Sequence, residues 1–192
     1  MPVVIGTMQK TFANPVGLLS DCHRRIESFL STLLAVASHA DGALDTERRN
    51  ALETALKYFR EAAPMHTADE EESLFPLLRL LGRPDISGVL QQLERLESDH
   101  KTAESWLREI EGIGQCWLRQ EQICPQEATR LKDLVVSLSE LYAAHIAMEE
   151  GLVFPMAEAE LSESDKRVLG RAMASRRGLL SRSISTAVGC TE

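Results

Sequence analysis

Residues 66–76 read HTADEEESLFP, and residues 145–155 read HIAMEEGLVFP. Both stretches follow one pattern, H-x-x-x-E-E-x-x-Φ-F-P, in which Φ is an apolar residue. A histidine and a glutamate four positions apart lie on the same face of a helix. One helical turn of each stretch can therefore offer an imidazole and a carboxylate to the same metal ion.

A further histidine precedes each copy at a similar distance. His23 lies 43 residues before His66, and His100 lies 45 residues before His145. The repetition therefore extends to the segments upstream, and it predicts two related halves, each a helix–loop–helix unit.

Apolar residues recur at intervals of three and four along four long segments, which predicts an all-α, up-down-up-down four-helix bundle. Asn14 and Pro15 are suited to be the N-cap and first residue of the first helix. Pro64 and Pro76 fall inside the second helix, where we expect bends rather than ends. The expected helices span residues 15–40, 45–81, 87–119 and 125–156.

A shorter fifth helix is expected after the bundle. Ser162 and Asp165 form a capping-box pattern that opens a helix running to about Arg177. The sequence thus predicts three parts: an N-terminal arm (1–13), a four-helix bundle (14–160), and a C-terminal helix and tail (161–192).

Every long helix carries one histidine inside its apolar stripe, and two of them add a glutamate one turn later. A charged carboxylate in such a stripe is costly to bury unless it is paired or bound to a metal ion. A single histidine there is usually a hydrogen-bonded core residue, but four matched histidines with two matched carboxylates favour a metal site. The candidate ligands are His23, His66, Glu70, His100, His145 and Glu149. The alternative without metal is a helical scaffold in which these side chains form a buried hydrogen-bond network.

Imidazole and carboxylate ligands without thiolate suit iron, manganese or zinc. Six ligands exceed what one tetrahedral zinc ion uses. Two ions about 3.5–4 Å apart, bridged by Glu70 and Glu149, would use all six and leave positions open for a small molecule. The sequence does not assign each histidine to one of the two ions.

The order H…HxxxE…H…HxxxE, with the following apolar residue, Phe and Pro, resembles the hemerythrin-like, or HHE cation-binding, domains over about residues 14–160. The resemblance implies a four-helix bundle around a non-haem di-iron centre. Its cofactor would be two iron ions joined by an oxo or hydroxo bridge, with manganese or zinc less favoured.

The sequence departs from the oxygen-carrying members of that family at two positions. Those proteins have a second histidine four residues after the third-helix histidine, where this chain has Glu104. They also place an aspartate five residues after the fourth-helix histidine, where this chain has Glu150. We choose Glu149, at the fourth position, as the ligand because it matches Glu70.

Three further residues are candidates for the surroundings of the centre. Glu104 and Glu27, each four residues after a candidate ligand, could bind metal directly, hydrogen-bond a ligand, or face solvent. Tyr142, one turn before His145, could approach the centre or serve as a core aromatic residue.

The resemblance implies two classes of function, and the ligand set does not choose between them. One is a di-iron protein that binds or senses dioxygen or nitric oxide. The other is an enzyme in which the same centre reduces peroxide or nitric oxide, or donates iron for cluster repair. Its partners would be small molecules.

The formal net charge of −8 argues against a general nucleic-acid-binding surface. No apolar run of 18 residues is present, so we expect no membrane span and a cytoplasmic protein. The four cysteines show no zinc-like spacing, and they are expected to be reduced. Asp69 and Glu71, together with the basic residues Arg176 and Arg177, are expected on solvated faces.

Overall fold

The computed structural model describes residues 12–40, 42–82 and 87–179. Within these ranges all regular structure is helical and there is no strand, which confirms the predicted all-α class. The expected arm of residues 1–13 and the end of the expected tail lie almost wholly outside the described residues.

The first half begins with α2, Pro15–Ala37. Its start is fixed by Asn14, whose side-chain oxygen accepts a hydrogen bond from the backbone N–H of Gly17 at 3.0 Å. Pro15 occupies the first turn, where a missing N–H costs nothing. The predicted start of this helix is therefore correct.

The second segment is divided where one bent helix was expected. It consists of α3 (Thr46–Glu61), α4 (Ala63–Asp69), the π-helical turn η1 (Glu70–Leu74) and α5 (Phe75–Leu80). The interruption falls at Ala62, two residues before Pro64, because proline cannot donate a hydrogen bond to the preceding turn. At Pro76 the helical segment is not interrupted, but the wider π-helical turn η1 comes directly before α5, which contains this proline.

The second half repeats this plan with longer helices. It consists of α6 (Ser87–Gln120), α7 (Pro125–Met148), the π-helical turn η3 (Glu149–Val153) and α8 (Phe154–Glu160). The expected fifth helix is α9, Glu163–Arg176, and Ser162 and Asp165 form its capping box as predicted.

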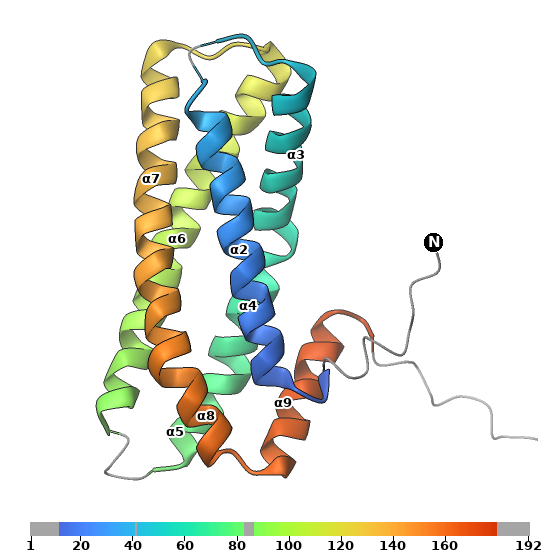
Figure 1. Cartoon of the computed structure of the whole chain (residues 1–192), viewed down its shortest axis with the longest axis vertical. Coiled ribbons are helices and arrows are strands. Elements are labelled where there is room, and N and C mark those ends of the chain that lie inside the picture. The colour runs from blue at the N-terminus through green and yellow to red at the C-terminus, as the bar shows by residue number, and fades with distance from the viewer. Residues whose placement is uncertain (1–11, 41, 83–86, 180–192) are drawn as a thin grey trace, which may run out of the picture.

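The four long segments stand side by side as a bundle (Figure 1). Each is in contact with two others: α2 packs on α3 and α7, and α6 packs on the same two helices. Successive segments run in opposite directions, which is the predicted up-down-up-down arrangement (Figure 1). The short α9 lies against the outside of α2 and α4 near one end of the bundle.

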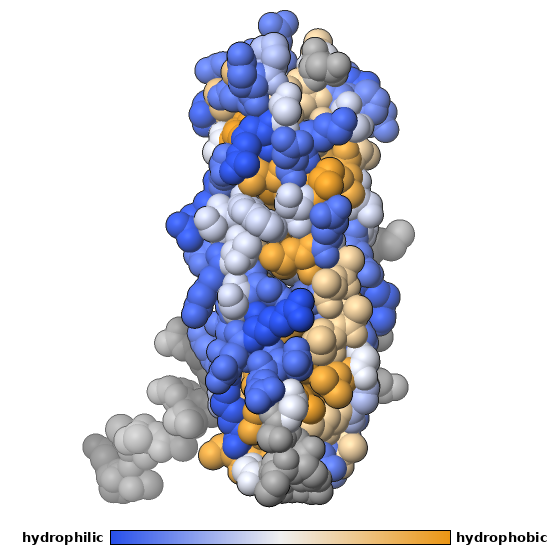
Figure 2. Space-filling model, turned by 90° about the vertical axis from the view of Figure 1, so that its left-hand side faces the viewer, coloured by the Kyte–Doolittle hydropathy of each residue, from blue (hydrophilic) through white to orange (hydrophobic). Residues whose placement is uncertain are grey.

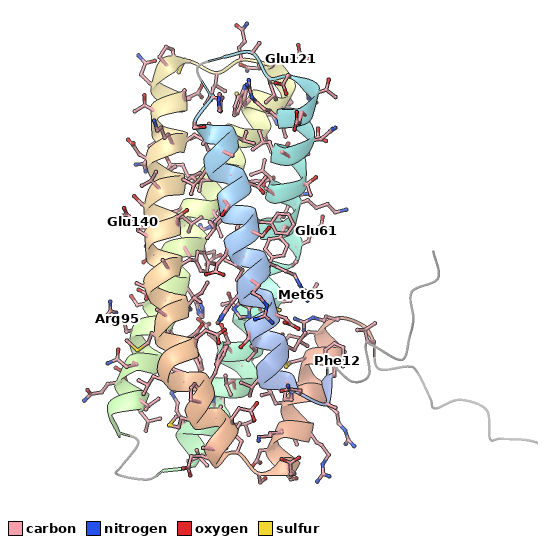
Figure 3. The ribbon with its side chains drawn as sticks, viewed as in Figure 1. Phe12, Glu61, Met65, Arg95, Glu121 and Glu140 are labelled. Carbon is pink, nitrogen blue, oxygen red and sulfur yellow. The ribbon has the colours of Figure 1, made fainter. Side chains whose placement is uncertain are left out.

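The core consists of two apolar clusters with a polar layer between them. Along α2, Leu19 belongs to one cluster and Ile26 to the other, with His23 between them. Along α6, Leu96 and Ala103 flank His100 in the same way. Figure 3 shows nitrogen and oxygen atoms gathered between the helices at about the level of Met65, whereas the labelled Glu140 lies on the outside.

The outer surface is mostly polar. The face in Figure 2 is hydrophilic over much of its area, with hydrophobic patches among the charged side chains. No helix in the described ranges is long and apolar enough to cross a membrane.

Candidate metal centre

The six candidate ligands meet in the polar layer, although they come from four different parts of the chain. Glu70 and Glu149 are completely buried, and the four histidines are all at least 94% buried because their exposed fractions are 2–6%. His23 comes from α2, His66 from α4, His100 from α6 and His145 from α7. Each of the four bundle segments therefore contributes one imidazole, as the sequence predicted.

The ligand atoms form two overlapping groups. One comprises His23, His66, Glu70 and Glu149, and the other comprises His100 and His145 with the same two glutamates. Within each group the potential ligand atoms all lie within 4.8 Å of one another. This grouping pairs histidines within each half of the molecule, which the sequence left unassigned. The two glutamates are common to both groups, so the arrangement is consistent with a dinuclear metal site.

All four imidazoles direct Nε2 toward the carboxylates. His23 Nε2 lies 3.0 Å from Glu149 Oε2, and the other three Nε2 atoms lie 3.3–3.4 Å from the nearest carboxylate oxygen. The i to i+4 pairs His66–Glu70 and His145–Glu149 are both 3.3 Å apart. The spacing within the repeated motif therefore places each imidazole beside its own carboxylate, as helical geometry requires.

The donor atoms at the centre fit a cation. Neither oxygen of Glu70 or Glu149 accepts a hydrogen bond from any residue of the described ranges, although all four oxygens are buried. Nε2 of His23 and of His145 is likewise buried without a hydrogen bond from or to a described residue. Buried polar atoms normally have a partner, and two buried carboxylates need positive charge nearby. Metal ions would satisfy both requirements.

In the metal-free protein, protonated imidazoles provide part of that positive charge. Burial lowers the pKa of His23, but the carboxylates of Glu149 and Glu70 outweigh it and raise the pKa to about 10. Burial likewise opposes the effect of Glu70 and Glu71 on His100, whose pKa rises to about 9. Burial prevails at His66 and lowers its pKa. Metal ions entering the centre must therefore displace protons.

The pKa of the glutamates changes in the opposite sense to that expected from burial alone. Burial raises the pKa of Glu70, but the surrounding imidazoles His66, His100 and His23 outweigh this and hold it well below its ordinary value. The pKa of Glu149 is also lowered, since His145 and His23 outweigh burial and the charge of Glu70. Both carboxylates are therefore ionised and available as metal ligands.

These pKa shifts predict how the stability of the metal-free protein depends on pH. His23 and His100 have a folded-state pKa above the unfolded value of about 6.5. Their protonated forms therefore stabilise the fold fully below about pH 6.5. This stabilisation is lost as the pH rises through about 9 and about 10. We expect the melting temperature of chelator-treated protein to fall over this range, while that of metal-loaded protein stays nearly constant. Thermal melts of both forms at several pH values measure this, and parallel curves would contradict it.

The second glutamate of each motif supports a histidine of the other half. Glu71 Oε1 accepts a hydrogen bond at 2.8 Å from Nδ1 of His100. Glu150 Oε1 lies at the same distance, 2.8 Å, from Nδ1 of His23. A carboxylate acceptor at Nδ1 fixes the tautomer that leaves the Nε2 lone pair free for a metal ion. Each half therefore orients a candidate ligand of the other half.

The phenylalanine of each motif contacts the same histidines. Phe154 stacks on the ring of His23 with centroids 5.1 Å apart, and Phe75 lies nearly parallel to the ring of His100 at 6.5 Å. The histidine, both glutamates and the phenylalanine of the motif thus have contacts at the centre, whereas the apolar position, Leu74 or Val153, belongs to an apolar cluster. From the sequence we expect a role only for the histidine and the first glutamate, although the second glutamate and the phenylalanine recur with equal regularity.

Nδ1 of the other two histidines has no such support. Nδ1 of His66 and Nδ1 of His145 are both buried without a hydrogen-bond partner among the described residues, although Nδ1 of His145 lies 3.6 Å from Asp99 Oδ2. Each group of candidate ligands therefore contains one imidazole that is hydrogen-bonded through Nδ1 and one that is not.

The π-helical turns explain how two consecutive glutamates can both serve the centre. Each turn begins at the buried glutamate, and the backbone N–H of Phe75 or Phe154 bonds to the carbonyl of the residue five positions earlier. The following proline cannot donate to an α-helical carbonyl, which favours the wider turn at this point. Such turns are frequent at functional sites.

We expect Glu71→Gln and Glu150→Gln each to weaken metal binding by roughly 10–100-fold, because an amide is a poorer acceptor for Nδ1–H than a carboxylate. Titration of the metal-free variants against a competing chelator measures this. Glu104→Gln is the matched control, since it makes the same change on a side chain that is 70% exposed. Equal affinities in the two motif variants and the control would contradict a role in orienting the ligands.

The structure does not bring Glu104 or Glu27 to the centre. Glu104 is exposed and lies 3.7 Å from Arg108, and Glu27 is also exposed. Their positions match solvent-facing charges, one of the alternatives that the sequence left open. Tyr142 is buried, and its ring centroid lies 6.0 Å from that of His145. Of the three additional candidates, the structure therefore places only Tyr142 beside the predicted ligands.

The expectation of solvated faces was wrong for Asp69, Arg176 and Arg177. Asp69 is completely buried, and its two carboxylate oxygens lie 2.8 Å from Arg176 Nη1 and 2.7 Å from Arg177 Nη2. The two arginine side chains are only about one-fifth exposed. The reason is the position of α9, which packs against α4 and η1 and covers this side of the motif. Glu71 is also partly buried, because it faces His100.

Comparison with known proteins agrees with this geometry. The sequence model of one protein family, the hemerythrin HHE cation binding domain, matches residues 14–157 of this chain. A protein of Haemophilus influenzae, described only as uncharacterized, is 30% identical over 169 residues, which is 87% of this chain and 92% of that protein.

Proposed function

This chain belongs to the hemerythrin HHE cation-binding family, and on that premise we propose that its buried centre holds two iron ions. We further propose that the centre binds or senses dioxygen or a related small molecule such as nitric oxide.

One observation supports the proposal above all others. Glu70 and Glu149 belong to both groups of candidate ligands, and their four oxygens are buried without hydrogen bonds from the described residues. A single ion would use only one of the two groups. Two ions, each with two imidazoles and sharing both carboxylates, would use all of these atoms.

The donor set favours iron among the metals considered. Imidazole and carboxylate together suit iron, and four protein ligands per ion leave positions open for a small molecule. Iron in this site would supply redox chemistry at those positions. Manganese and zinc remain the less favoured occupants.

The protein side chains around the centre restrict what can bind. The carboxylates are fully buried and lie between two apolar clusters, so bulk water and large solutes are kept away. Glu71 and Glu150 hold His100 and His23 in the orientation that ligation requires. These features suit a small molecule that enters an enclosed site.

Elemental analysis of protein purified without added metal tests the first part of the proposal. We expect about two iron ions per chain, whereas a helical scaffold with a buried hydrogen-bond network would contain about none. One ion per chain, or zinc as the only metal, would overturn the di-iron assignment.

Mixing the reduced, iron-loaded protein with dioxygen and, separately, with peroxide tests the second part. A spectral change that reverses when dioxygen is removed would support binding or sensing. Rapid irreversible oxidation with catalytic turnover of peroxide would instead identify an enzyme, which is the alternative function.

A further inference from the structure

A groove of about 470 Å³ lies on the bundle between α3–α4 and α6. Its walls include Leu56 and Phe59 from α3, Ala68 from α4 and Leu107 from α6. The groove is open to solvent along the surface, and its lining reaches inward to His100 and Tyr142. It therefore connects the outside of the molecule to the edge of the candidate metal centre.

Two residues of the groove lining lie at the centre or beside it. His100 is a candidate ligand whose Nε2 lies 3.4 Å from Glu70 Oε2, and its Nδ1 is hydrogen-bonded to Glu71, which also lines the groove. Tyr142 lies beside His145, and the charges of Glu70 and Glu149 are close enough to add to the rise in the pKa of Tyr142 that burial causes. Tyr142 is therefore a residue of the groove lining that also lies beside a candidate ligand.

The chemistry of the groove suits an uncharged molecule. Its deeper walls are apolar, being formed by side chains such as Leu56, Phe59 and Leu107. The charged lining residues comprise three cations and four carboxylates, and the pairs Arg60–Glu111 and Arg108–Glu104 lie 2.7 and 3.7 Å apart. An anion would gain little from this lining, whereas a small neutral molecule loses nothing by leaving water for the apolar part.

We propose that this groove is the entrance through which a small uncharged molecule reaches the centre, with Tyr142 as its gate on the side of His100 and His145. The inference rests on the proposed function, because it supplies the route for the molecule that the metal ions would bind. It also specifies the side from which the molecule would arrive. The groove lining includes His100, from the group of His100 and His145, but neither His23 nor His66.

The internal repeat of the chain offers a matched pair of variants. Ala68 lies two residues after His66 and is a half-buried residue of the groove wall. Ala147 lies two residues after His145, is exposed, and is not part of this groove. Ala68→Phe would place a ring in the groove, and Ala147→Phe makes the same change at the equivalent place in the other half.

The first measurement is the rate at which nitric oxide changes the visible spectrum of the reduced, iron-loaded full-length protein. We expect Ala68→Phe to slow this rate at least about tenfold and Ala147→Phe to leave it within about twofold, because only the first obstructs the entrance. Leu107→Trp is a second obstruction from the opposite wall, for use if Ala68→Phe does not fold. Iron content must equal that of the wild type in each variant. An unchanged rate in the obstructed variants would overturn the proposal.

The second measurement does not depend on iron. Xenon is a neutral apolar probe that enters cavities lined by apolar side chains. Methyl NMR spectra of the full-length metal-free protein under xenon should show shifts at Leu56 and Leu107, and Ala68→Phe should abolish them. If the protein contains no iron but these shifts appear, the di-iron proposal fails and the groove still binds neutral molecules. If iron is present and the shifts are absent, the entrance is wrong and the metal centre stands.

Discussion

Replacing Glu149 with alanine should leave the protein with at most one metal ion per chain and destabilise it by about 3–5 kcal/mol, the range typical of breaking a buried charge cluster. Glu149 belongs to both ligand groups, so its loss affects both ions at once. Its carboxylate also lies 3.0 Å from His23 and 3.3 Å from His145, whose buried imidazoles would lose a charge partner. Mass-spectrometric metal analysis and urea unfolding measure the two effects.

Three further variants isolate the cause. His66 belongs to only one group, so His66→Ala should lose about one ion and retain the other. Glu149→Gln keeps the volume of the side chain and removes its charge, which separates the electrostatic effect from a packing defect. Glu140→Ala makes the same truncation at an exposed position of α7 and should change neither quantity. Full metal content and unaltered stability in Glu149→Ala would show that this carboxylate is not a ligand.

The fold was predictable from the sequence because its main determinants are local. Asn14 and Pro15 specify the start of α2, and Ser162 with Asp165 specifies the start of α9. Most apolar residues of the stripes that predicted the bundle lie in the two core clusters or pack against them, but Leu152, which was expected in the fourth stripe, is exposed. The local sequence did not predict the interruption at Ala62. A bend was expected at Pro64, but the helix is broken between Glu61 and Ala63.

The cluster of six candidate ligands was predictable because burying charge is costly. A charged glutamate in an apolar stripe is costly to bury unless it is paired or bound to a metal ion. Because this glutamate recurs at the same spacing from a histidine, the sequence indicated a shared metal site. The grouping of the histidines was not predictable, since it depends on which helices are neighbours and on their relative rotation. The partnerships of Glu71 with His100 and of Glu150 with His23 join opposite halves, and helical spacing contains no information about such contacts.

The burial of Asp69 was also beyond the sequence, because it depends on where α9 packs. Asp69 follows the pattern of an exposed residue in an acidic run, and Arg176 and Arg177 follow that of a solvated helix end. Only the position of α9 against α4 brings them together and excludes water from the carboxylate. The C-terminal helix is therefore attached to the motif at the residue immediately before Glu70.

Because of this attachment, the loss of both arginines should strongly destabilise the protein. Arg176→Met combined with Arg177→Met should lower the free energy of unfolding by about 3–5 kcal/mol, because it leaves the carboxylate of Asp69 buried without its positive partners. Methionine retains most of the apolar length of arginine, so the loss is mainly electrostatic. Urea unfolding of the metal-free and metal-loaded proteins measures it.

The control for this variant lies on the same helix. Arg167 and Arg171 are exposed residues of α9, so Arg167→Met with Arg171→Met makes the same chemical change and should cost much less. Adding Asp69→Leu to the Arg176/Arg177 pair removes the unpaired charge and should restore most of the lost stability, since an apolar side chain can replace a buried ion pair with little penalty. If the triple variant is no more stable than the double one, the arginines act through packing of α9 and not through the charge of Asp69. Recovery in the triple variant would instead show that α9 is held at the metal-binding motif by this buried carboxylate.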